Sequence, residues 1–183
     1  MKFVQPIRDP VKLNEIKEYL KEQNPKNYIL FLIGISTGYR ISDILRLKVK
    51  DVKETHITIR QKKTGKVKMV LICKSLRREL DLYISNMSDA DYLFPSRNRN
   101  GRKPSPITRN IAYKIIRNAA AEFGLKDVGT HSMRKTFGFK IYLKMKDIAL
   151  LMDHFNHDEE KVTLRYIGLF QETQDDALED FEL

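Results

Sequence analysis

Three short segments of the chain hold residues that could act together on a phosphate ester. Arg40 follows a Thr-Gly-Tyr turn, His131 and Arg134 are three residues apart, and Tyr166 follows His157 by nine residues. Guanidinium groups pair with phosphate oxygens through two hydrogen bonds, imidazoles exchange protons near neutral pH, and a tyrosine hydroxyl can act as a nucleophile. These residue types could therefore bind a phosphate ester and attack it.

The spacing inside the segments indicates how the side chains are held. Gly38 ends an apolar segment two residues before Arg40, which places Arg40 at a helix junction from which it can enter a cleft. Asp43, three residues further on, predicts a bidentate ion pair with Arg40. His131 and Arg134 are expected on one helix face. Either pair alone could be an ordinary surface pair, so only the full set points to one site.

The order of these residues resembles the tyrosine recombinases of the phage integrase family. An arginine after Thr-Gly-aromatic, a hairpin lysine, His-x-x-Arg, and a histidine followed nine residues later by tyrosine occur in that order. Carried over position by position, the family's catalytic residues fall on Arg40, Lys63, His131, Arg134, His157 and Tyr166, with Asp43 at its acidic supporting position. Lys62 and Lys66 share the hairpin tip with Lys63, and counting back from Met69-Val70-Leu71 favours Lys63.

The resemblance implies site-specific DNA recombination or integration, as performed by phages and mobile elements, without a metal or nucleotide cofactor. The two arginines would stabilise charge on the nonbridging phosphate oxygens, and His157 would donate a further hydrogen bond. His131 would be the general base and Lys63 would protonate the departing 5′ oxygen. Tyr166 would form a 3′-phosphotyrosyl intermediate. The sequence has no G-x-x-x-x-G-K-[ST] run for a triphosphate.

Three alternatives stay open at this point. A type IB topoisomerase would use a similar active site and rejoin the original ends, whereas a DNA-binding module would use the same basic surface without catalysis. A metal site is conceivable around His154 and His157, but further fixed ligands are missing there. Asn156 stands where the family usually has glycine, a mild departure because a left-handed turn tolerates asparagine.

The charge distribution favours nucleic acid as the partner. The net charge is +10, and residues 171–183 hold six acids and no base, so residues 1–170 carry +16. Such a field attracts polyanions, although it could also be a merely soluble basic surface. The resemblance narrows the partner to double-stranded DNA. Residues 95–105 are expected to form an exposed basic loop. The candidate DNA contacts of this loop and the hairpin tip are Lys62, Lys66, Arg97, Arg99, Arg102 and Lys103.

Composition predicts a single cytoplasmic domain over residues 1–183. The 183 residues are 42% hydrophobic, enough for one sizeable core. No run approaches the roughly 20 apolar residues of a membrane helix, and the first residues do not form a signal peptide. Cys73, the only cysteine, allows no internal disulfide and is expected to be buried in a strand. The family's N-terminal core-binding domain is expected to be absent, which predicts weak, salt-sensitive DNA binding.

Helices are expected to position most of the candidate residues. Hydrophobic periodicity and capping residues predict helices over 10–23, 28–37, 42–47, 75–87 and 106–124, and mostly helix from 131 onward. Alternation predicts strands at 56–60 and 67–72, and 52–54 could add a third. The expected fold is α+β, a mostly helical domain with a small antiparallel β-sheet, which is the tyrosine recombinase catalytic-domain fold.

The acidic tail, residues 171–183, is expected to take part in contacts between subunits. Phe170, Ala177, Leu178 and Phe181 would share one helical face, which the family often uses to dock onto a neighbouring subunit on DNA. Folding back onto the same domain is the alternative. Without DNA, a monomer is expected.

Overall fold

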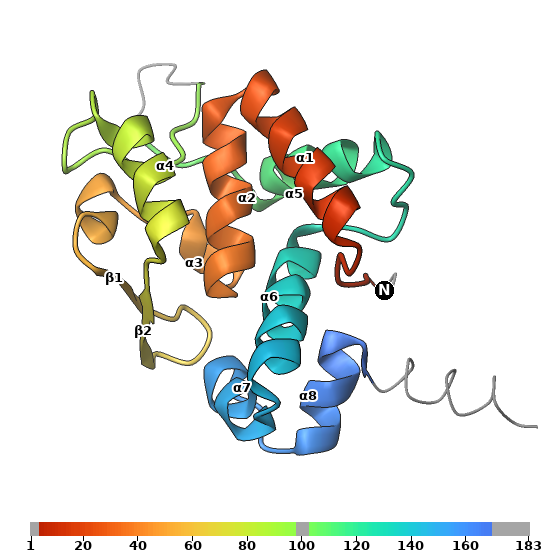
Figure 1. Ribbon diagram of the computed structural model, residues 1–183. Coiled ribbons are helices and arrows are strands. Elements are labelled where there is room, and N and C mark those ends of the chain that lie inside the picture. Colours follow the sequence, from red (N-terminus) through yellow and green to blue (C-terminus); the bar gives the residue numbers. More distant parts are fainter. Residues whose placement is uncertain (1–3, 98–102, 170–183) are drawn as a thin grey trace, which may run out of the picture.

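A buried helix, α2 (Pro25–Thr37), runs through the middle of the molecule, and α1 (Pro10–Gln23), α4 (Lys74–Ile84) and α6 (Thr130–Met145) pack around it (Figure 1). The computed structural model describes residues 4–97 and 103–169. Because neighbouring helices cover α2 on several sides, six consecutive residues, 28–33, are all buried. The sequence prediction of a helix over 28–37 that Gly38 ends is confirmed; the helix begins earlier, at Pro25, and Gly38 has a left-handed φ of 62°.

The described residues form further helices. They are α3 (Ile41–Ile44), the short 3-10 helix η1 (Val49–Val52), α5 (Arg109–Ala121), α7 (Ile148–Phe155) and α8 (Glu160–Ile167). Helices α7 and α8 pack against each other and against the C-terminal half of α6 (Figure 1). A second, smaller hydrophobic cluster lies there, around Phe137, Leu151, Phe155 and Ile167.

The sheet has two antiparallel strands, β1 (His56–Arg60) and β2 (Val67–Leu71), with His56 opposite Leu71 and Arg60 opposite Val67. The third strand considered at 52–54 is wrong. Val49 and Val52 are both fully buried, and a spacing of three suits a helical turn rather than a strand. The backbone N–H of Lys48 donates to Asp51 at 2.9 Å and closes that turn.

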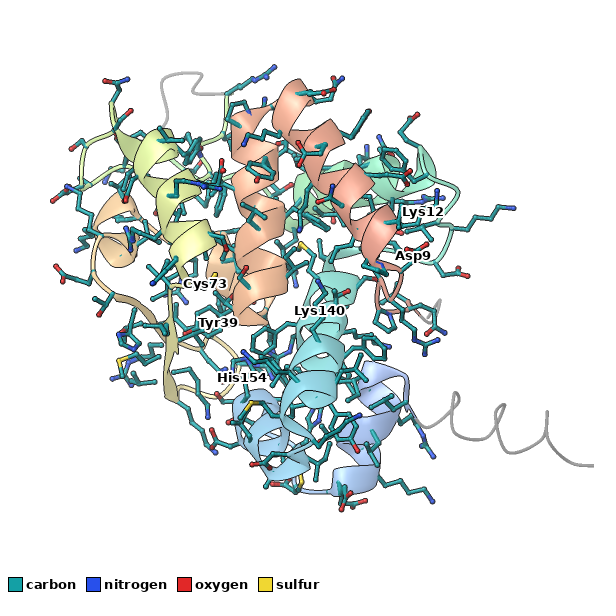
Figure 2. The ribbon with its side chains drawn as sticks, in the orientation of Figure 1. Asp9, Lys12, Tyr39, Cys73, Lys140 and His154 are labelled. Carbon is teal, nitrogen blue, oxygen red and sulfur yellow. The ribbon has the colours of Figure 1, made fainter. Side chains whose placement is uncertain are left out.

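Cys73 is exposed, which contradicts the expectation that it is buried. The strand alternates between faces, and Ile72 points into the core with 7% of its surface exposed, so its successor points outward. Figure 2 shows Cys73 where β2 leads into α4. No helix within the described residues is long and apolar enough to cross a membrane.

Candidate active site

Five candidate residues, two of them arginines, gather in one cluster. They come from the α2–α3 junction (Arg40), from α6 (His131 and Arg134) and from the α7–α8 region (His157 and Tyr166). After burial, the charges of Arg134 and Arg40 are among the causes that lower the pKa of both histidines, and both charges also act on Tyr166. Arg134, His157 and Tyr166 all contact the Phe155 ring, and His131 lies one helical turn before Arg134, so these groups share one neighbourhood in which the charge of Arg40 also acts.

Arg134 is the buried centre of this cluster, with 3% of its surface exposed. Its guanidinium donates to the carbonyl of Gly38 and, at 3.3 Å, to the carbonyl of Phe155. The Phe155 ring lies under it, with its centroid 4.4 Å from Cζ. Burial lowers the pKa of Arg134 to about 10, so the group is still a cation at neutral pH. Contacts from α2 and α7 therefore fix its orientation.

Gly38 is needed for this arrangement in two ways. Its φ of 62° is left-handed backbone that favours glycine, and a Cβ there would overlap the Phe137 ring. The same residue supplies the carbonyl that holds Arg134. The turn that ends α2 and the orientation of the guanidinium thus depend on one residue without a side chain.

Arg40 enters the site without the ion pair expected from its sequence. Within the described residues, no ion pair joins Arg40 to Asp43, and Nη1 of Arg40 is buried without a hydrogen-bond partner. Asp43 instead accepts from the backbone N–H of Lys62 at 3.0 Å, across 19 residues. Asp43 thus supports the hairpin rather than the arginine. A buried N–H that no protein group satisfies suits an anionic ligand, because such a group is costly unless paired.

The ring of Tyr166 lies between aromatic and cationic neighbours. Its centroid is 5.2 Å from those of Phe155 and His157, and the Lys135 ammonium lies 5.3 Å from it. Burial raises the pKa of Tyr166, while the charge of Arg134, a hydrogen bond with it and the charge of Arg40 oppose that rise. The hydroxyl is therefore protonated at neutral pH and needs a proton acceptor before it can attack.

The two histidines differ in how firmly they are held. His157 has its Nδ1 3.1 Å from the Thr163 hydroxyl, which orients the ring and leaves Nε2 for a ligand. His131 is exposed in the first turn of α6. Desolvation by burial is the largest cause of its lowered pKa, and the charges of Arg134, Lys135 and Arg40 lower the pKa further. A lowered pKa keeps His131 neutral at pH 7, the state that can accept a proton.

His154 is a packed aromatic ring. It stacks on Tyr39, with centroids 6.2 Å apart and planes 6° apart, and lies 4.8 Å from Phe137 (Figure 2). Its Nε2 is buried without a hydrogen-bond partner, and burial, then the charge of Arg134, lowers its pKa to about 4. In the part of the chain that the structure describes, no three His, Cys, Asp or Glu residues are placed to hold a metal.

This buried imidazole should make the fold sensitive to acid. The pKa of His154 is about 4 when folded and near the ordinary 6.5 when unfolded, so the unfolded chain binds more protons between these values. The free energy of unfolding should therefore fall as the pH drops from 6.5 to 4, by up to about 3 kcal/mol from this residue. Denaturant unfolding at both ends of that interval measures the effect. His154→Phe should lose most of it, and an unchanged pH dependence in that variant would assign the effect elsewhere.

The hairpin lysines lie at the edge of the cluster. Lys62, Lys63 and Lys66 are exposed, and the Lys63 ammonium forms no hydrogen bond or ion pair with any described residue. The structure therefore brings the tip to the site, through Asp43, but does not bring Lys63 into contact with the other five residues. Arg97 and Lys103 are exposed, whereas Arg99, Arg102 and the tail residues 170–183 lie outside the described residues.

Two residues near the site were not identified from the sequence. Lys135 is 5% exposed under Tyr166, and Gln61 is 2% exposed at the base of the hairpin tip. A signal for Gln61 was present: Ile57 and Ile59 face inward on β1, so the residue two further on should face inward too. Tyr39, beside Arg40, is buried, and its hydroxyl donates to the carbonyl of Ile57 at 2.8 Å.

Comparison with known proteins identifies the class. The phage integrase family model matches residues 9–172. The chain is 45% identical, over 94% of both sequences, to a probable integrase/recombinase, YoeC, of Bacillus subtilis. It is 25% identical to the tyrosine recombinase XerA of Pyrococcus horikoshii, of which it spans 60%. The chain therefore belongs to the phage integrase family.

Solved structures agree on the fold. The XerA recombinase crystal structure has a TM-score of 0.72 at 22% identity, covering 98% of this chain and 67% of that one. The XerH recombinase bound to its difH substrate has a TM-score of 0.71 at 22% identity, covering 99% of this chain and 56% of that one. The predicted family and the predicted fold, a tyrosine recombinase catalytic domain, are both confirmed.

Proposed function

We propose that this chain cuts and rejoins double-stranded DNA at specific sites through a covalent intermediate on Tyr166. The observation that carries the proposal is the position of Tyr166 beside buried Arg134: the Phe155 ring lies 4.4 Å from that guanidinium and 5.2 Å from the Tyr166 ring, and the charges of Arg134 and Arg40 act on the Tyr166 hydroxyl. A phosphate bound to both guanidiniums would lie beside that hydroxyl. Family membership and the likeness to recombinases solved with DNA support the same reaction.

Each group then has one chemical role. The Tyr166 oxygen attacks phosphorus while His131 accepts its proton, and the bond to the 5′ oxygen breaks as Lys63 gives that oxygen a proton. Arg40 and Arg134 stabilise the charge that grows on the nonbridging oxygens. The products are a 3′-phosphotyrosyl bond and a free 5′ hydroxyl. Attack by a 5′ hydroxyl reverses the step, so the bond energy is kept for rejoining.

A trapping substrate tests this proposal. A duplex nicked so that the 5′ fragment diffuses away should leave a protein–DNA adduct, detected as a labelled band on a denaturing gel. Chelator should not change its yield. A pure DNA-binding module would give no adduct. A different strand supplied with a 5′ hydroxyl should be joined to the adduct by a recombinase, whereas joining of the original strand alone would favour the topoisomerase alternative.

The basic surface supplies the proposed DNA contacts. Lys62 and Lys66 at the hairpin tip and Arg97 and Lys103 at the loop are exposed and would pair with backbone phosphates. Arg99 and Arg102 are included on sequence grounds. Binding should weaken with salt, as for any contact dominated by phosphates. DNA as substrate also favours a cytoplasmic location.

Self-association on DNA through the acidic tail is part of the proposal. Each of the C-terminal helices exposes apolar side chains: Leu143 and Met145 on α6, Leu150 on α7 and Val162 on α8, and Lys144 of α6 is exposed too. This surface complements a tail with six acids and apolar residues between them. Sedimentation should show a monomer without DNA and larger assemblies on DNA that shrink when residues 171–183 are deleted. A stable tetramer without DNA, or no effect of the deletion, would contradict it.

Cleavage should lose rate in acid through His131. Desolvation and nearby cations lower the pKa of His131 below 6.5, so the base is neutral above that lowered value and protonated below it. The single-turnover rate should therefore be flat near neutrality and fall as the pH drops through a point below 6.5. His131→Ala should be slow throughout without that step. Circular dichroism at each pH separates the step from acid unfolding.

A further inference from the structure

The side chain of Gln61 ties the hairpin tip together and to the α7–α8 region. Its Oε1 accepts from the Thr64 hydroxyl at 2.7 Å and from Nδ2 of Asn156 at 2.9 Å. Its backbone N–H donates to the carbonyl of Lys66, and its own carbonyl accepts from Gly65, both at 2.9 Å. Gln61 is 2% exposed, so its own end of these bonds is buried, while Thr64 is exposed and Asn156 is half-buried.

The two ends of this amide–amide bond stand next to proposed catalytic residues. Gln61 precedes Lys63 by two residues, and Asn156 directly precedes His157. Asn156 has a left-handed φ of 55° at the end of α7, and its backbone N–H donates to the carbonyl of Asp153 at 3.1 Å. Glycine, the usual residue of the family here, could end the helix in the same way but could not reach Gln61.

We infer that Gln61 and Asn156 are positioning residues that hold the hairpin tip over the site, so that Lys63 can deliver its proton to the 5′ oxygen. This inference rests on the proposed function. The exposed lysine has no partner of its own within the described residues, so its reach depends on the backbone beneath it. That backbone is fixed at Lys62 by Asp43 and at Gln61 by Asn156.

A second link between the same two elements provides a matched control. Lys68 of β2 donates to the Asp153 carboxylate of α7 at 2.6 Å, but the Asp153 side chain is 82% exposed. Ion pairs that water can reach contribute little to stability. Lys68 also donates to the backbone carbonyl of Asp153 at 2.9 Å, so Asp153→Asn weakens this link by removing its charge and leaves the Gln61–Asn156 bond untouched.

The test compares two leaving groups in single-turnover cleavage. On the ordinary phosphodiester, Asn156→Gly should cleave about 10- to 100-fold more slowly, part of the roughly 10²- to 10⁴-fold typical of general acid catalysis. On a substrate whose 5′ bridging oxygen is sulfur, the thiolate leaves without a proton, so Asn156→Gly should match the wild type. Gln61→Met also removes the bond from Thr64, so it should lose at least as much rate as Asn156→Gly, and the double variant should lose no more than Gln61→Met, because the amide–amide bond is already gone in that variant.

The outcomes separate this inference from the proposed function. Lys63→Ala should show a larger loss with the same rescue by sulfur, and Asp153→Asn should stay at the wild-type rate on both substrates. Equal losses on both substrates for Asn156→Gly, no loss at all, or no rescue of Lys63→Ala would overturn the inference. An inactive wild type on both substrates would instead refute the proposed function.

Discussion

Tyr166→Phe should abolish the covalent protein–DNA adduct while leaving the fold intact. The substitution removes only the attacking oxygen, and the ring keeps its contacts with Phe155, His157 and Lys135. Loss of a nucleophile typically lowers the rate by about 10⁴-fold or more. The measurement is the labelled adduct on the nicked trapping duplex, with DNA binding followed separately by fluorescence anisotropy.

Tyr113→Phe is the matched control for this experiment. Tyr113 lies on α5 with 41% of its surface exposed, and its hydroxyl forms no hydrogen bond with any described residue, so its variant should form adduct at the wild-type rate. Adduct that persists in Tyr166→Phe would show that another residue is the nucleophile. Adduct missing from both variants would point to a general effect on the protein rather than on one hydroxyl.

Arg40→Ala should lower the cleavage rate far more than the affinity for DNA. The buried Nη1 of Arg40 has no partner in the described protein, so its hydrogen bond would be made to the phosphate and strengthened as negative charge grows there. Removing one such donor typically costs about 10²- to 10³-fold in rate. Single-turnover cleavage at saturating DNA gives the rate, and a binding titration at the same salt concentration gives the affinity.

Arg46→Ala provides the comparison, since Arg46 is an exposed arginine just beyond the same short helix. It should change the rate little, because its guanidinium is already hydrated and its charge is not among those that act on Tyr166. Equal losses of rate and affinity in Arg40→Ala would mean that Arg40 holds DNA in the ground state only. Arg134 suits this test less well, because its replacement would also leave the carbonyls of Gly38 and Phe155 without their donor.

Local chemistry predicted much of the fold. The helix over 10–23 has the predicted ends because Asp9 caps it, accepting from the backbone of Val11 at 2.7 Å, and Pro10 opens it. The start expected at 106 is wrong, since the Thr108 hydroxyl caps α5 and Pro106 pairs with Pro95 in a β-bridge. Such a bridge depends on a residue distant in sequence, which local patterns do not reveal.

In the candidate site, too, local patterns predicted some features, and contacts between residues distant in sequence determined the others. The order of six residue types was enough to predict which groups gather, and five of them do. The role of Asp43 could not be predicted, because its partner is a backbone N–H 19 residues away that arrives only when the hairpin folds over α3. Asn156 was noted only as a departure from the family, since its bond to Gln61 spans 95 residues.

The guanidinium of Arg134 braces the end of α2 against the end of α7, so binding and architecture share one side chain. Any attempt to turn this protein into an inert DNA reader should therefore spare it. A version that still recognises a sequence but leaves the strands intact is better made at Tyr166, whose oxygen can be removed while the brace stays in place. The choice of inactivating mutation thus decides whether the variant binds DNA as a stable protein or is destabilised.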